Sequence, residues 1–201
     1  MADFTTAKTW SVGDTLPAAD MNTYVRDNVQ HLYDNAVLLI DEYEVATTDV
    51  QTITFDSISQ DFSTLRVEFV AATTHSAQDK LVVRANNALS TDSYTRVCYW
   101  YILNSGVNSA QESPHSYIFD NFYIQPSSNA GQWQHGNMTF SGYSNTSINT
   151  YGMADFIDPQ SYIRWFHSGI YNSTDAVTRL DFIMATGNFE VGSKISLYGY
   201  R

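Results

Sequence analysis

Histidines are the side chains of this sequence to test first for metal binding or acid–base catalysis. The five of them are scattered singly, with no pair at metal-ligand spacing: His31, His75, His115, His135 and His167. Because a zinc site needs several ligands that converge on one ion, each histidine is better interpreted as a surface or strand-face residue. No Gly-rich phosphate loop, zinc-protease motif, nucleophile elbow or EF-hand loop occurs. We therefore expect no catalytic residues, no metal site and no cofactor.

A pair of carboxylates is the catalytic arrangement that the sequence leaves open. Glycoside hydrolysis needs two acids brought to within about 5–10 Å of each other across the fold. The candidate acids are Glu112, Asp120, Asp155 and Asp158. Almost any sequence offers as many acids, so a carbohydrate-active enzyme remains an alternative to a protein that is not an enzyme.

Aromatic side chains beside polar ones are candidate ligand contacts. An aromatic ring can stack on a sugar face while neighbouring Asn and Ser side chains form hydrogen bonds. On this reasoning Trp133, His135 and Tyr143 are candidate contacts for a glycan. The alternative is that most aromatics, Trp100 and Trp165 included, fill a core or pack between subunits.

The charge of the chain restricts its partners. The net charge is −11, and residues 1–61 hold eleven acids against two bases, Lys8 and Arg26. Phosphate binding needs a basic face, so we expect neither nucleic acid nor an anionic membrane as a partner. The acidic front part serves solubility or docks on a basic surface.

Cysteine content and the N-terminus indicate where the chain is made. A single cysteine, Cys98, excludes an intramolecular disulfide, and its apolar surroundings predict a buried, inert thiol. Residues 1–5 carry no signal-peptide pattern, and no run approaches the roughly 20 apolar residues of a membrane span. We expect synthesis in a cytoplasm and no membrane insertion.

The secondary structure predicted from the sequence changes from helix to strands near residue 40. Apolar residues recur three and four positions apart between Pro17 and Asn35, and Pro17 suits a first helical turn. The pattern predicts one amphipathic helix after an extended arm, and the apolar stripe consists of Met21, Tyr24, Val25, Val29, Leu32 and Ala36. An isolated helix of this length is marginal in water, so we expect it to meet copies of itself or another protein.

Beyond Val37 the apolar period becomes two, as in Ile53–Phe55 and Leu65–Phe69. Further strands are predicted at Leu81–Ala85, Tyr94–Leu103, Tyr117–Gln125, Trp133–Tyr143, Tyr162–Tyr171, Thr178–Ala185 and Lys194–Tyr200. Short strands separated by turn clusters such as Ala85-Asn86-Asn87 indicate a sandwich or jelly roll. The predicted fold is all-β: a jelly-roll-like antiparallel β-sandwich (residues 41–201) after an N-terminal arm and α-helix (residues 1–40).

A spaced pattern in residues 8–28 consists of Trp10, Gly13, Ala18, Met21, Asn22, Arg26, Asp27 and Asn28. In these positions the segment resembles a leader found on many bacteriophage tail and virion-appendage proteins. More loosely, the β region is similar to the jelly-roll-like domains that follow this leader. The matching positions there are Phe55, Ile58, Gln60, Phe62, Leu65, Val67 and the closing run 191–199.

The resemblance implies a non-enzymatic virion structural protein: a homotrimeric tail appendage, in a fibre or tail tip, made in the host bacterial cytoplasm. Residues 1–40 would attach it to other virion proteins and form the trimer, and a host-surface glycan is a candidate ligand. A three-fold helix bundle could use polar residues to fix its register. The expected assembly residues are Trp10, Met21, Tyr24, Val25, Arg26, Asn28, Val29 and Leu32.

Two other roles fit the same observations. A capsid decoration or head-fibre protein would use the leader in the same way but clamp shell subunits. A free sugar-binding module would have no assembly role.

Overall fold

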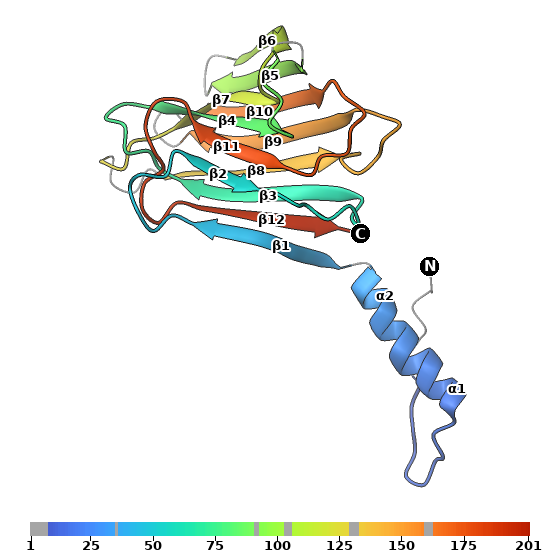
Figure 1. Ribbon diagram of the computed structural model, residues 1–201. Helices are drawn as coiled ribbons and strands as arrows, with labels where there is room; N and C mark the ends of the chain where they lie inside the picture. Colours follow the sequence, from blue (N-terminus) through green and yellow to red (C-terminus); the bar gives the residue numbers. More distant parts are fainter. Residues whose placement is uncertain (1–7, 35, 91–92, 103–105, 129–132, 159–162) are drawn as a thin grey trace.

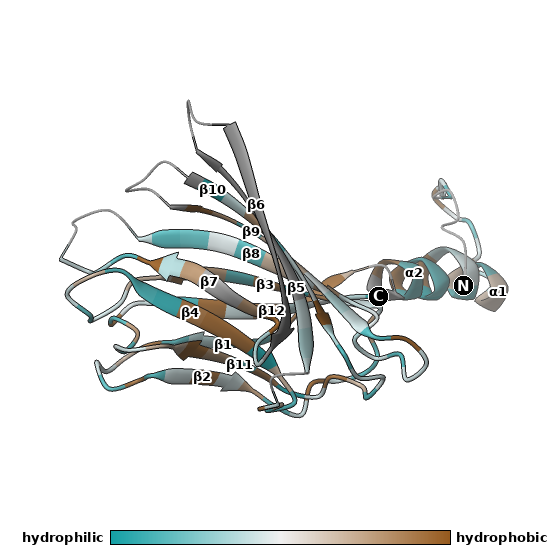
Figure 2. Ribbon diagram, turned by 90° about the horizontal axis from the view of Figure 1, so that it is seen from above, coloured by the Kyte–Doolittle hydropathy of each residue, from teal (hydrophilic) through white to brown (hydrophobic). Residues whose placement is uncertain are grey.

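A helical arm and a β-sandwich make up the molecule (Figure 1). The computed structural model describes residues 8–34, 36–90, 93–102, 106–128, 133–158 and 163–201. The helix leaves the sandwich at the end where the C-terminus lies, and seen from above it extends beyond the ends of the strands (Figure 2).

The larger sheet has eight strands, and all its strand pairs are antiparallel. In spatial order its strands are β1 (Val37–Glu44), β12 (Lys194–Tyr200), β3 (Thr64–Ala71), β8 (Gln134–Ser141), β9 (Thr150–Asp158), β10 (Ile163–Tyr171), β5 (Tyr94–Ile102) and β6 (Gly106–His115). The smaller, also antiparallel, sheet consists of β2 (Thr52–Phe55), β11 (Leu180–Met184), β4 (Asp79–Ala85) and β7 (Phe119–Ile124).

The core lies between the two sheets because successive strand residues point to opposite faces. On β3, Leu65, Val67 and Phe69 are buried, while Arg66 and Glu68 lie on the other face. Aromatic rings from both sheets meet in the core, where the Phe69 and Phe122 rings lie edge to face with centroids 6.2 Å apart. The all-β sandwich predicted from the alternating pattern is therefore confirmed.

Three strands, β1, β6 and β9, were not among those predicted from the sequence. Strand β6 (Gly106–His115) contains few residues with strand propensity, so its sequence gives little strand signal. The expected domain boundary between residues 40 and 41 falls inside β1, so the sandwich begins at Val37. The predicted turn at Asn86 and Asn87 is confirmed, since both residues have positive φ angles of 51° and 52°, a conformation that Asn tolerates.

The predicted helix between residues 17 and 35 is present as three consecutive segments. They are α1 (Ala18–Met21), a π-helical stretch η1 (Asn22–Asp27) and α2 (Asn28–Asp34). Pro17 stands at the N-cap with φ −62° and ψ 143°, so the helix begins one residue later than expected. A π-helical turn is wider than an α-helical turn, which changes the angular spacing along the apolar stripe.

Tyr94 joins β5 to the smaller sheet by a buried hydroxyl. Its side chain is fully buried, and its ring packs on Tyr171 with centroids 5.4 Å apart. The hydroxyl accepts a hydrogen bond from the Ala85 amide (3.0 Å) and donates one to the Ala85 carbonyl (2.9 Å). Burial raises the pKa of Tyr94, because the charged phenolate would lose its hydration.

Replacing Tyr94 with Phe tests this link. The variant removes the acceptor of the buried Ala85 amide, while the Ala85 carbonyl keeps its hydrogen bond from the Ala88 amide (3.0 Å). Tyr94→Phe is therefore expected to lower the free energy of unfolding by about 1–3 kcal/mol. Urea denaturation followed by tryptophan fluorescence measures the change. The matched control is Tyr43→Phe, an exposed tyrosine of β1, for which a change within about 0.5 kcal/mol is expected. Equal changes in the two variants would contradict the structural role of the Tyr94 hydroxyl.

Candidate functional site

An uncovered apolar stripe runs along the N-terminal helix. It consists of Met21, Val25, Val29 and Leu32, and we call these four residues the helix stripe. Their exposed fractions lie between 43% and 61%. Apolar side chains repeated on one helix face normally pack against a partner, and the part of the chain that the structure describes does not cover these four.

The N-terminal arm packs on a different side of the same helix. The Lys8 ammonium lies 2.5 Å from the Asp20 carboxylate, 4.5 Å from the centroid of the Trp10 ring and 5.7 Å from that of the Tyr24 ring. The hydrogen bond and the charge of Asp20 raise the pKa of Lys8. Trp10 and Tyr24 therefore lie beside the arm, whereas the side chains of the helix stripe remain 43–61% exposed.

The two remaining expected assembly residues, Asn28 and Arg26, differ in burial. Asn28 is buried and its side-chain amide donates a hydrogen bond to the Tyr24 carbonyl (3.3 Å). Arg26 is exposed and pairs with Asp27 at 2.8 Å, as a solvated ion pair does. Of the eight expected residues, the four of the helix stripe are thus the ones with exposed apolar side chains.

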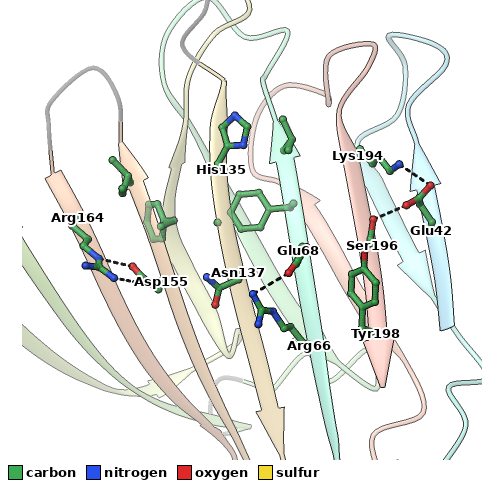
Figure 3. Close-up of a pocket in the computed structure, with 15 residues that line it drawn as sticks. Glu42, Arg66, Glu68, His135, Asn137, Asp155, Arg164, Lys194, Ser196 and Tyr198 are labelled. Atoms are coloured by element: carbon green, nitrogen blue, oxygen red, sulfur yellow. Dashed lines mark hydrogen bonds and ion pairs between the residues drawn. The ribbon is translucent and has the colours of Figure 1, made fainter. Parts of the chain in front are cut away.

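A second surface feature is a groove of about 540 Å³ on the outer face of the larger sheet, which we call the sheet groove. Side chains from β1, β12, β3, β8, β9 and β10 line it (Figure 3). Its polar members are Glu42, Arg66, Glu68, His135, Asn137, Asp155, Arg164, Lys194, Ser196 and Tyr198. Alternation places every second residue of these strands on this face, and the strand register brings them side by side.

Gly136 supports the floor of the sheet groove from the core side. A Cβ at this position would lie 2.6 Å from the Phe69 ring and 2.7 Å from Cβ of Phe156. Both phenylalanines are buried and take the space that a side chain would occupy. Glycine is therefore required between His135 and Asn137.

Charges in the sheet groove occur as three ion pairs. Lys194 lies 2.8 Å from Glu42. On the neighbouring strand β3, Arg66 lies 2.9 Å from Glu68. Near the far end Arg164 binds Asp155 through two hydrogen bonds. Three cations balance three carboxylates, so the groove offers both donors and acceptors without a net formal charge.

The electrostatics of Glu42 make it a poor general acid. Hydrogen bonds from Lys194 and from the Ser196 hydroxyl (2.8 Å) lower the pKa of its carboxyl. A general acid in glycoside hydrolysis needs a raised pKa instead. Likewise, the hydrogen bond to Asp155 raises the pKa of Arg164, which keeps that guanidinium charged.

The candidate ligand contacts differ in exposure. His135 lines the sheet groove and is exposed. Trp133 precedes β8 and is not among the lining residues. Tyr143 is fully buried, and its hydroxyl donates a hydrogen bond to the Ser59 carbonyl (2.5 Å). The expectation that Tyr143 contacts a ligand is therefore corrected: its hydroxyl ties two loops together inside the fold.

Of the four candidate acids, Asp155 lies in the sheet groove. The side chains of Glu112, Asp120 and Asp158 lie outside the described part of the chain, as does that of Cys98. The lining residues Arg66, Asn137 and Arg164 were not expected from the sequence. In the sequence they stand at the polar positions of alternating strands. This alternation predicts that they face outward, but it does not predict which strands lie next to one another.

Within the described ranges, no group of three or more His, Cys, Asp or Glu side chains is arranged to hold a metal ion. No helix in these ranges is both long enough and apolar enough to cross a membrane. Comparison with known proteins finds no family model that matches the chain and no match among curated proteins.

Replacing Lys194 with Met tests the electrostatics of the sheet groove. Loss of the ammonium is expected to move the pKa of the Glu42 carboxyl back up toward 4.5, its ordinary value. Carbon-detected NMR titration of glutamate side chains measures it. Since the folded pKa is lowered, the stabilisation from this pair is present above the unfolded pKa and lost as pH falls through the folded one.

Lys80→Met, at an exposed lysine of the other sheet, is the control and should leave the Glu42 titration unchanged. A Glu42 carboxyl that titrates at its ordinary value in the unmodified protein would contradict the described pairing.

Proposed function

We propose that the protein is a non-enzymatic structural component of a bacteriophage particle, assembled as a homotrimeric appendage of the tail. In this role the N-terminal arm and helix form the trimer and attach it to other virion proteins, and the sandwich faces outward. The observation that carries the proposal is the helix stripe, an exposed apolar surface on a helix that projects from the sandwich (Figure 1).

The energetic argument is that the helix stripe needs a covering surface. Burial of apolar surface stabilises a protein by roughly 25 cal/mol per Å², whereas an isolated helix of this length is marginal in water. The sandwich buries its own apolar faces between its two sheets. Association with the same stripe of other copies supplies the missing contact.

The leader resemblance provides the viral setting and the number of copies. Residues 8–28 resemble the N-terminal leader of bacteriophage appendage proteins, and those proteins are homotrimers attached through it. A three-helix bundle is a common arrangement for short amphipathic helices. The exposed Asn22 and Arg26, interleaved with the helix stripe, are suited to the outer surface or the register of such a bundle.

A capsid decoration or head-fibre protein is the second candidate, since the same helix would serve to attach it to the shell. The sheet groove favours display on a tail, because its mixture of donors and acceptors suits hydrogen bonds to a host-surface glycan. A carbohydrate-active enzyme is a third candidate, and in it Glu42, whose carboxyl pKa is lowered, would not be the general acid.

Charged substitutions in the helix stripe test the assembly. Met21→Asp or Val25→Asp is expected to convert the trimer to monomers, because a carboxylate would be buried in an apolar bundle without a partner. Sedimentation equilibrium of the full chain measures the mass. Asn22→Asp, at an exposed polar position of the same helix, should remain trimeric. Circular dichroism establishes that the sandwich is folded in every variant. A trimeric Val25→Asp protein would show that the helix is not the assembly element.

Removal of residues 1–36 tests attachment to the particle. The shortened protein is expected to fold but to be missing from purified virions, while the full chain is incorporated. Quantitative mass spectrometry of the virions measures both the loss and the copy number. A few copies per particle agree with a tail component, whereas hundreds would identify a capsid decoration protein. Normal incorporation of the shortened protein would refute attachment through the leader.

A further inference from the structure

The outer faces of the two sheets differ in apolar character. Large hydrophobic side chains with more than a third of their surface exposed stand on the outer face of the larger sheet, at Val37, Leu39, Tyr151, Met153, Ile157 and Phe166. Among the described residues of β2, β4, β7 and β11, no large hydrophobic side chain is exposed to that degree. Contiguous exposed apolar surface marks an interaction site, and here one of the two sheet faces carries it.

Strand register places four of these residues at the end of the sheet nearest the helix. One row runs across five strands in the order Val37, Tyr200, Thr64, Ser141 and Tyr151. The next row runs through Leu39, Tyr198, Arg66, Thr139 and Met153. We call the apolar and aromatic members of these rows the proximal patch: Val37, Leu39, Tyr151, Met153, Tyr198 and Tyr200.

The proximal patch has the shape of two ridges with a hollow between them. Val37 and Leu39 form one ridge on β1, and Tyr151 and Met153 form the other on β9; their exposed fractions lie between 50% and 67%. On the strands between the ridges lies a hollow of about 490 Å³, lined by Ser63, Thr64, Arg66, Thr139, Tyr200 and Arg201. A ridge of another protein surface can seat in such a hollow.

The short connection between the helix and β1 indicates which protein surface covers the proximal patch. The helix ends at Asp34 and β1 begins at Val37, so three residue steps, a reach of at most about 11 Å, join them. Packed helices have axes about 8–10 Å apart, whereas a sheet of eight strands is roughly 34 Å across. In copies joined by a common helix bundle, the ends of the sandwiches nearest the helix therefore lie close to one another.

We propose that the proximal patch is the contact surface between the β-sandwiches of neighbouring copies of this chain. The proposal rests on the helix-mediated assembly proposed above and adds a second interface to it. β1 carries one ridge of the patch and begins three residue steps after the helix that carries the helix stripe. The outer face of the smaller sheet then points away from the neighbouring copies.

Two exposed methionines report separately on the two interfaces. Met21 belongs to the helix stripe and Met153 to the proximal patch, with exposed fractions of 43% and 67%. Oxidation to the sulfoxide adds one oxygen atom from hydrogen peroxide to the sulfur, releases water, and follows the exposure of the side chain. Peptide mass spectrometry after brief peroxide treatment therefore measures the burial of each residue.

The experiment compares the full-length assembled protein with the full-length Val25→Asp variant at the same concentration. In the assembled protein, oxidation of Met153 is expected to be about fivefold slower or more, because its sulfur is covered. Protection of both methionines supports both interfaces. Protection of Met21 with full reactivity of Met153 would overturn the proximal patch and leave the helix assembly standing. Full reactivity of both would overturn both proposals.

A matched pair of substitutions provides a readout that does not depend on the Val25→Asp reference. Leu39→Asp, in the proximal patch, is expected to raise the concentration at which trimers dissociate by tenfold or more, since the change buries a charge. Leu89→Asp, at a leucine of similar exposure outside the patch, should leave that concentration unchanged. Sedimentation velocity across a dilution series measures it, and circular dichroism verifies folding. Equal dissociation of the two variants would overturn the proposal.

Discussion

The central physical constraint on this protein is that its N-terminal helix carries apolar side chains that remain exposed. The sandwich closes its core between two sheets, where residues such as Phe69, Phe122 and Phe140 are fully or almost fully buried, and its inner faces need nothing from the helix. The helix is therefore left with Met21, Val25, Val29 and Leu32 exposed. The transfer of such side chains out of water is favourable, which is the physical basis of the proposed association.

Alternation in the larger sheet produces two different surfaces on its outer face. Near the helix the outward positions hold apolar and aromatic side chains, including Leu39 and Met153. Farther along the same strands they hold the ion pairs of the sheet groove. One face thus combines a surface suited to burial with a surface suited to hydrogen bonds in water. The two surfaces follow each other along the strands, and the apolar one lies at the end from which the helix leaves.

The sheet groove shows why exposed ion pairs alone do not indicate chemistry. Each carboxylate there faces a cation, and exposed pairs of this kind contribute little to stability. Their arrangement nevertheless fixes the direction of donors and acceptors around His135 and Asn137. The lining thus presents donors and acceptors in fixed directions, with three cations balanced by three carboxylates.

The sequence by itself determined the helix, the all-β class and most of the strands, because 3.6-residue and two-residue apolar periods are local properties of a chain. Tertiary structure decided which predicted residues share a surface. Tyr24 shares the helical pattern of Val25, yet the arm with Lys8 and Trp10 packs at its side of the helix. Tyr143, polar and aromatic like a ligand contact, is buried, and the sheet groove joins strands that are distant in sequence. Neighbours across a sheet depend on register between remote segments, which local patterns do not encode.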